Sequence, residues 1–142
     1  ISILKLITEY NPFLLDVEFN TLKKNQKLKQ YLKSSKTTIL VSWHDFKKTP
    51  GTKRLDSTLK EMKKMSNYVK IVTVAKSIND TTKILSLYNK SSKIKLIAFA
   101  MGEEARFSRI LCLHLGSPFT YVSLGKAVAP GQFSLTAIKS FQ

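Results

Sequence analysis

Lys70 is the residue of this sequence with the clearest potential for chemistry, because it is an amine within an apolar, strand-like run. Its neighbours in the run 68–74 are mostly β-branched, a composition typical of a buried strand. Burial disfavours the charged ammonium form, and the free amine is the form that attacks a carbonyl carbon. The position therefore predicts a Schiff-base lysine. The alternative is that Lys70 reaches solvent or pairs with an acid such as Asp16.

His44 is the second candidate, because it follows the apolar run 37–43 and precedes Asp45. A histidine at the carboxyl end of a strand lies where proton transfer is commonly placed, so the position predicts a general acid or base. The alternative is a capping or structural histidine. His114 falls late in an amphipathic stretch and is expected to interact with a helix C-terminus rather than to react.

Other kinds of reactive site have less support in the sequence. The histidines, the single cysteine and the acids lack the paired spacing of metal ligands, so no metal site is predicted. No glycine-rich phosphate loop follows a strand, and we predict no cofactor. A serine hydrolase is not favoured, since no GxSxG turn is present. Cys112 lies among apolar residues and is expected to be a buried small hydrophobe.

Apolar runs alternate with amphipathic stretches along the whole chain, which predicts a parallel sheet with helices between its strands. An amphipathic helix that ends at Asn11-Pro12 comes first. Predicted strands then cover residues 13–19, 37–43, 69–74, 94–100 and 119–124, and predicted helices cover residues 21–33, 55–65, 78–88 and 103–115.

A doubly wound sheet and a (βα)₈ barrel both fit this alternation. The candidate residues favour the barrel, because Asp16, His44 and Met101 lie at or near strand ends, where barrel enzymes gather reactive groups. A complete barrel has roughly 200 to over 400 residues. We therefore expect residues 1–142 to form a single domain, the C-terminal part of a barrel with about five of eight βα units, and we expect the other three to precede Ile1.

The formal net charge of +15, from 24 basic and 9 acidic residues, raises the question of a polyanionic partner. Only Arg54, Arg106 and Arg109 are arginines, and the lysines are scattered without interleaved aromatic residues, so the pattern does not favour nucleic acid. A positive field also attracts a small carboxylate substrate. A basic nucleic-acid-binding module is the alternative. No run predicts a membrane span or a signal peptide, so a cytoplasmic location is expected.

Several segments occur in a characteristic order. They are Ser42-Trp43-His44-Asp45-Phe46 with Thr49-Pro50, Val69-Lys70-Ile71, Met101-Gly102-Glu103 with Ser108-Arg109, Gly116-Ser117-Pro118-Phe119-Thr120-Tyr121, and Ala129-Pro130-Gly131-Gln132. Together these segments resemble, almost from end to end, the successive signatures of type I 3-dehydroquinate dehydratases.

The resemblance implies a lyase of the shikimate pathway of aromatic amino-acid biosynthesis that dehydrates 3-dehydroquinate. It implies that Lys70 forms an imine with the substrate ketone and that His44 moves the protons. It further implies that Arg109 binds the substrate carboxylate, that Gln132 contacts substrate hydroxyls from a covering loop, and that Asp16 supports the site. Members of this family often form dimers, so a homodimer is expected.

Two departures from the family pattern limit what the chain is expected to do alone. Val128 stands where many members have a serine. The family's Glu-x-Arg strand and Arg…Glu-Gly-Gly segment have no counterpart here, so the acid that orients His44 is expected to lie outside this chain. The alternatives are a barrel remnant without catalysis and, less favoured, a Schiff-base aldolase on the same barrel.

Overall fold

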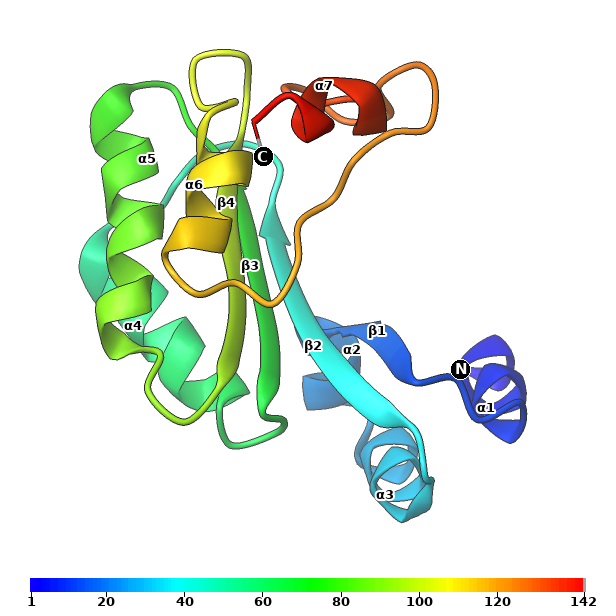
Figure 1. The fold of residues 1–142 in the computed structure, drawn as a ribbon. Helices are drawn as coiled ribbons and strands as arrows, with labels where there is room; N and C mark the ends of the chain where they lie inside the picture. Colours follow the sequence, from blue (N-terminus) through cyan, green and yellow to red (C-terminus); the bar gives the residue numbers. More distant parts are fainter. Residues whose placement is uncertain (142) are drawn as a thin grey trace.

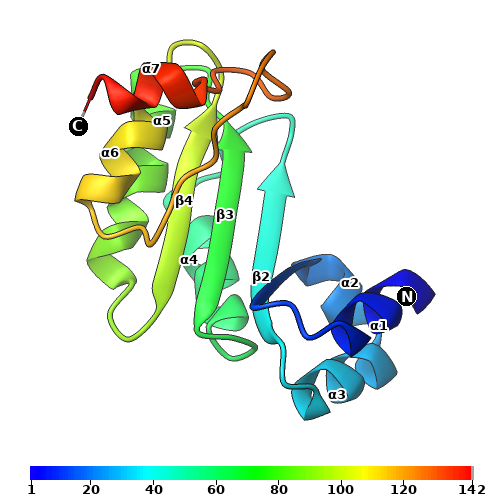
Figure 2. The same ribbon diagram turned by 45° about the vertical axis from the view of Figure 1, so that its right-hand side comes forward.

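The computed structural model describes residues 1–141, and its centre is one sheet of four parallel strands (Figure 1). The strands are β1 (Leu14–Glu18), β2 (Thr38–Asp45), β3 (Tyr68–Val74) and β4 (Lys95–Met101), and each pairs with the next one in the sequence. Figure 2 shows β2, β3 and β4 side by side with their carboxyl ends at the same edge. In a barrel the strands follow one another around the sheet in the order of the sequence. In a doubly wound sheet the order of the strands reverses at one point, so the sequential order observed here is that of a barrel.

Short helices connect the strands, and side-chain caps set several of their starts. They are α1 (Ser2–Glu9), α2 (Phe19–Lys24), α3 (Gln26–Ser34), α4 (Thr52–Met62), α5 (Ile78–Leu85), the 3₁₀ helix η1 (Ser86–Lys90), α6 (Ser108–His114) and α7 (Leu135–Lys139). Asn25 accepts a hydrogen bond from Leu28 N, which starts α3 and splits the predicted helix 21–33 in two. Ser77 caps α5 in the same way.

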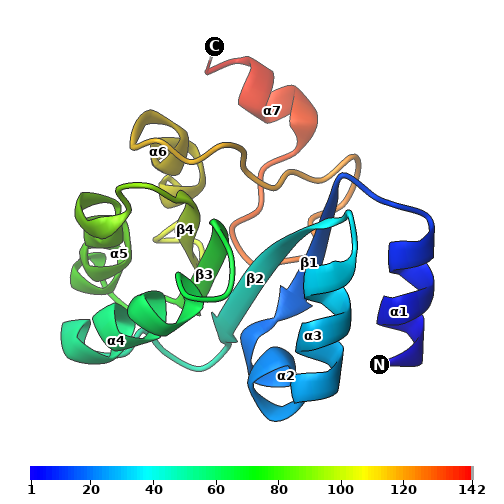
Figure 3. The same ribbon diagram turned by 90° about the horizontal axis from the view of Figure 1, so that it is seen from below.

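The two faces of the sheet have different surroundings, as the alternation of side chains along each strand requires. Val41 and Ile71 point to one face, where they pack in a buried core with Leu28, Leu55 and Ile84 from the helices. In Figure 3, helices α2 to α5 lie outside the curve of the sheet, while the segment between α6 and α7 crosses its inner side. Helices on one face only and an inner face that curves inward are the architecture of a barrel wall.

The predicted fifth strand, residues 119–124, is wrong: within the described residues this segment makes only an isolated bridge, between Ser123 and Ser134. The aromatic rings of this segment pack against the sheet instead of extending it. Phe119 and Tyr121 pack on the inner face against the cluster that contains Val72 and Phe99, and the ring centroids of Phe99 and Tyr121 are 6.2 Å apart. Crossing this face buries apolar surface that would otherwise be open.

The outer edge of β4 explains why no strand pairs there, because side chains already satisfy its backbone groups. The Tyr88 hydroxyl accepts from Ala98 N at 2.8 Å and donates to Ala98 O at 3.0 Å. The Ser108 hydroxyl does the same for Ala100, at 3.0 Å and 3.3 Å. Two hydroxyls thus take the place of a fifth strand's backbone. They satisfy hydrogen-bonding groups of an edge strand that could otherwise pair with another strand.

The first helix, α1, forms as predicted, but much of its apolar side is exposed. Ile3, Leu6 and Ile7 are all exposed in the structure, together with Phe13 just before β1. None of the helices in residues 1–141 is long and apolar enough to cross a membrane.

We predict that Tyr88→Phe lowers the free energy of unfolding by about 1–3 kcal/mol, because it leaves the N–H and C=O of Ala98 without partners in a buried place. Urea denaturation measures the change. Tyr10→Phe is the matched control, since Tyr10 is 80% exposed, and it should change the free energy by less than about 0.5 kcal/mol. Equal effects of the two substitutions would contradict this account of the edge.

Candidate active site

Three neighbouring strands place polar side chains together on the inner face of the sheet. Asp16 and Glu18 come from β1, Ser42 and His44 from β2, and Lys70 from β3. The register pairs Glu18 with Ser42 and Ser42 with Lys70, so the three strands bring these residues into one row. Residues two apart on a strand share a face, and all five therefore face the interior of the curve.

Lys70 is buried, with 8% of its surface exposed, and its ammonium is paired. Nζ donates to Oδ2 of Asp16 at 2.7 Å and lies 4.7 Å from the ring centroid of Tyr121. The pairing with Asp16 that the sequence offered as an alternative is therefore present. It holds the amine in a fixed place on the inner face of the sheet.

His44 is held by an acid of this same chain, which corrects the expectation that its orienting acid lies elsewhere. Oε2 of Glu18 is 2.9 Å from Nδ1 of His44, and the hydroxyl of Ser42 donates to the same oxygen at 3.4 Å. The ring of Phe46 stacks on the imidazole with centroids 5.4 Å apart and planes 7° apart. Because Nδ1 faces the carboxylate, Nε2 is the nitrogen available to exchange a proton with a ligand.

Arg109 is the most deeply buried charged residue of the site, with 2% of its surface exposed. One guanidinium nitrogen donates to Pro130 O at 3.2 Å, and Cζ lies 4.5 Å from the ring centroid of Phe99. Its Nε has no hydrogen-bond partner within residues 1–141, although it is buried. Burial lowers the pKa of Arg109, and the group nevertheless stays charged. A buried donor without a partner is a place for an anion such as a carboxylate.

Four of the five predicted site residues line one pocket of about 230 Å³. They are His44, Lys70, Arg109 and Gln132, and Asp16 reaches the pocket through its contact with Lys70. The apolar part of the lining comes from Phe46, Val72, Phe99, Met101, Tyr121, Val128 and Ala129. The geometry thus joins the predicted residues in one place, while their chemical roles stay predictions.

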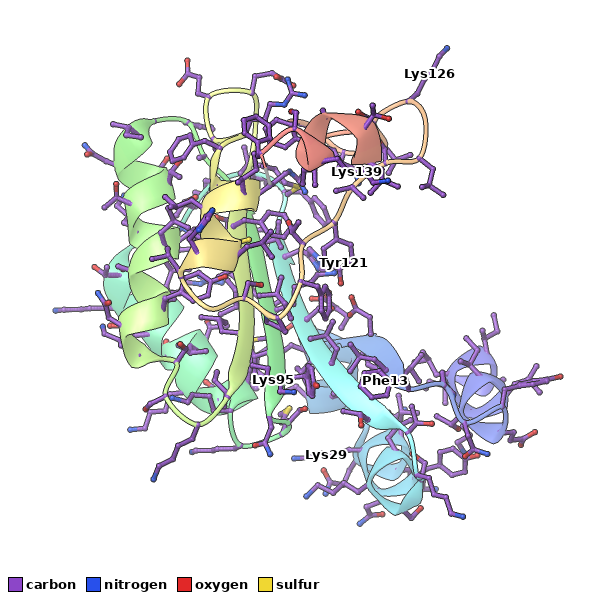
Figure 4. All side chains as sticks on the ribbon, viewed as in Figure 1. Phe13, Lys29, Lys95, Tyr121, Lys126 and Lys139 are labelled. Atoms are coloured by element: carbon purple, nitrogen blue, oxygen red, sulfur yellow. The ribbon has the colours of Figure 1, made fainter. Side chains whose placement is uncertain are left out.

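A loop of residues 125–133 covers this pocket and is fastened at its base. Oε1 of Glu103 accepts from Gly131 N at 3.1 Å, and Oε1 of Gln132 accepts from Val128 N at 2.9 Å. Gly131 has φ +70°, and a Cβ there would lie 2.5 Å from Gly102 O, so no larger residue fits without moving the loop. Figure 4 shows Lys126 at the tip of the loop, pointing away from the sheet.

Tyr121 belongs to the site, although the sequence gave it no role of its own. Figure 4 shows it beside the inner side of β2, and burial raises the pKa of its hydroxyl, so the phenol is neutral at ordinary pH. Its signals in the sequence were its place inside the predicted run 119–124 and at the end of a segment that resembles the family.

The remaining candidates from the sequence do not join the pocket. Cys112 is buried, as expected, and burial raises the pKa of its thiol. His114 lies in the last turn of α6 and is exposed. Residues 1–141 hold no group of three or more histidine, cysteine or acidic residues that could bind a metal ion.

The fold and the pocket define an α/β barrel wall that carries a lysine inside one strand and a histidine near the carboxyl end of the neighbouring strand. Comparison with known proteins places it more narrowly. The family model of type I 3-dehydroquinase matches residues 1–141, and the chain belongs to this family.

Curated relatives are about two fifths identical to this chain over the residues that align with it. The 3-dehydroquinate dehydratase of Methanococcus maripaludis (strain C6) is 41% identical over 142 residues, which are 98% of this chain and 64% of the relative. That of Dehalococcoides mccartyi (strain BAV1) is 40% identical over 126 residues, which are 87% of this chain and 56% of the relative. The chain therefore spans less than two thirds of the length of these relatives.

Solved structures confirm the fold class as part of a type I 3-dehydroquinate dehydratase barrel. The crystal structure of the enzyme from Geobacillus kaustophilus matches with a TM-score of 0.88 at 21% identity, covering 98% of this chain and 56% of that one. The enzyme from Aquifex aeolicus matches with a TM-score of 0.82 at 26% identity, covering 98% and 62%. The predicted barrel is thus confirmed, with four strands in place of five.

We predict that Gly131→Ala loosens the covering loop, because alanine disfavours φ +70° by about 1–2 kcal/mol and its Cβ would meet Gly102 O. Amide hydrogen exchange of the peptide 125–134 should become about 5- to 30-fold faster. Gly125→Ala is the control, since a Cβ there meets nothing within 4 Å. Unchanged exchange in the Gly131 variant would contradict the fastening described above.

Proposed function

We propose that this chain carries the imine-forming centre of a 3-dehydroquinate dehydratase, with Lys70 as the amine and His44 as the group that moves protons. Membership of the type I 3-dehydroquinase family supports the substrate class. The observation that carries the proposal is the shared pocket, in which a buried lysine, a histidine whose Nδ1 contacts Glu18 and a buried arginine meet.

Imine formation begins when Nζ of Lys70 attacks the ketone carbon. Its ammonium must first lose a proton, and Asp16, which contacts Nζ at 2.7 Å, is the group placed to receive it. The carbinolamine that results loses its hydroxyl as water, for which His44 supplies a proton. Glu18 keeps Nδ1 of His44 occupied and stabilises the imidazolium that each proton uptake creates.

The elimination follows from the electron-withdrawing power of the imine. Removal of the proton on the carbon next to the C=N bond gives an enamine, whose electrons then expel the hydroxyl on the next carbon. His44 takes the first proton and returns a proton to the departing hydroxyl, so the net loss is one water. A second water hydrolyses the imine and frees Lys70. One histidine can serve all these steps only if it stays at a constant orientation, and Glu18 and Phe46 provide this.

Substrate recognition would use the other side of the pocket. The guanidinium of Arg109, which lines the pocket, would bind the substrate carboxylate while it stays fastened to Pro130 O of the covering loop. Gln132 would contact substrate hydroxyls from the same loop. Val128 offers no hydroxyl, and the loss of one hydrogen bond to a neutral group weakens binding by about 1 kcal/mol.

Covalent chemistry is described for one structural relative. The crystal structure of the type I 3-dehydroquinate dehydratase from Clostridium difficile, with a TM-score of 0.84 and 22% identity, contains covalently modified comenic acid. The cytoplasmic location and the homodimer expected from the sequence stay predictions.

We predict that borohydride traps a substrate-sized adduct on Lys70 when the protein is incubated with 3-dehydroquinate. Intact-mass spectrometry detects the adduct, and peptide mapping locates it. Lys70→Ala should abolish it, because the nucleophile is gone. Lys95→Ala is the matched control, since Nζ of Lys95 also lies over a tyrosine ring, Tyr68, at 4.9 Å, but on the exposed surface.

An adduct that persists in Lys70→Ala, or that vanishes equally in Lys95→Ala, would contradict the proposed nucleophile. A folded protein that forms no adduct at all would favour the reading of the chain as a barrel remnant without catalysis. Circular dichroism and urea denaturation establish that each variant is folded before trapping.

A further inference from the structure

A second pocket lies at the amino-terminal end of the sheet, where β2 begins. It has a volume of about 170 Å³. Its walls come from α2, α3, the entry to β2 and the turn that precedes β3, and its lining residues are Leu22, Lys29, Leu32, Lys33, Ser35, Thr37, Ile39, Met65 and Ser66. None of these residues takes part in the site described above.

Thr37 is the unusual member of this lining. It is 6% exposed, and its hydroxyl has no hydrogen-bond partner within residues 1–141. The other two hydroxyls of the pocket are engaged: Ser35 donates to Leu32 O at 2.7 Å, and Ser66 donates to Ile39 O and accepts from Tyr68 N. A buried hydroxyl without a partner costs about 1–3 kcal/mol, and such a group requires an explanation.

Two lysines give the pocket its charge. Lys29 and Lys33 are one turn apart on α3, so they lie on the same side of the helix. The lining contains no acid, and the ion pairs of residues 1–141 involve other lysines, namely Lys23, Lys70, Lys83 and Lys90. Two lysines and a threonine with an unpartnered hydroxyl thus line one small hollow that contains no acid. An anionic oxygen bound there would be attracted by both ammonium charges.

Four apolar residues of the lining select the kind of anion. Leu22, Leu32, Ile39 and Met65 present side chains that an inorganic phosphate would leave without contact. A volume of this size equals about five or six water molecules at ~30 Å³ each, which is enough for one small ring. We propose that this pocket binds a small monocarboxylate with an apolar body, such as an aromatic ring, with the carboxylate toward Lys29, Lys33 and Thr37.

Titration with benzoate, followed by NMR of the Met65 methyl group, tests the proposal on the intact chain. We expect saturable shifts with benzoate and none with benzamide, which has the same shape without the charge. Thr37→Val keeps the shape of the side chain and removes only the hydroxyl, so the dissociation constant should rise about fivefold. Lys33→Gln should raise it by a similar or larger factor. The control is Lys36→Gln, an exposed lysine in the same loop that does not line the pocket.

The free energy of unfolding of Thr37→Val provides a second measurement, because it should stay equal or rise while the affinity for benzoate falls. Thr37→Val removes a buried hydroxyl that lacks a partner, so the ligand-free variant should be at least as stable to urea as the wild type while it binds benzoate more weakly. A variant that merely disturbed the fold would lose stability together with binding.

Three outcomes would overturn the proposal. They are equal affinity of Thr37→Val and wild type for benzoate, equal shifts with benzamide, and benzoate shifts confined to the pocket of Lys70 and Arg109. The test needs no turnover, so it stands whatever the outcome of trapping at Lys70.

Discussion

The ion pair between Lys70 and Asp16 spans a strand, and the rest of the site is arranged around it. Asp16 is on β1 and Lys70 on β3, with β2 between them. Strands lie about 4.8 Å apart, so the lysine must extend over the face of β2 to reach a carboxylate two strands away. Ser42, which pairs with Lys70 in the register, is small and buried, and leaves room for this crossing. The 2.7 Å contact therefore depends on the register of three strands at once.

The second pair, His44 with Glu18, depends on the same register of β1 and β2. Glu18 lies two residues after Asp16 on β1 and contacts His44, which lies two residues after Ser42 on β2. Lys70 and His44 thus each have their own acid, Asp16 for the amine and Glu18 for the imidazole. In the proposed mechanism, separate partners would allow the lysine to lose its proton while the histidine keeps its orientation. Tyr121 covers Lys70 from the inner side. On the other side of Asp16 the site is open, because β1 is an edge strand with which no further strand pairs within residues 1–141, and Asp16 and Phe13 are exposed there.

The sequence predicts those features that depend on local pattern. Lys70 in a β-branched run and His44 at the end of another were sufficient to place both residues on a parallel sheet, and the resemblance to a family added Arg109 and Gln132. The fifth strand could not be predicted, because its absence depends on the hydroxyls of Tyr88 and Ser108 at the edge of β4. Each comes from a helix, and only the packed fold shows that they replace a backbone partner.

The contact between Glu18 and His44 is likewise a property of register. The sequence shows that Asp16 and Glu18 share a face, but a shift of two residues between β1 and β2 would put one of these acids in the place of the other. The orphaned hydroxyl of Thr37 is another feature that no pattern reveals, since partners are known only once the fold is formed.

The most direct test of the central claim is exchange of the ketone oxygen of 3-dehydroquinate with ¹⁸O-labelled water, followed by mass spectrometry. Formation and hydrolysis of an imine on Lys70 replace that oxygen, whether or not dehydration follows. The account predicts exchange faster than in buffer alone, reduced to the buffer rate by Lys70→Ala. Exchange at the buffer rate with the folded protein, or equal exchange in the variant, would contradict it.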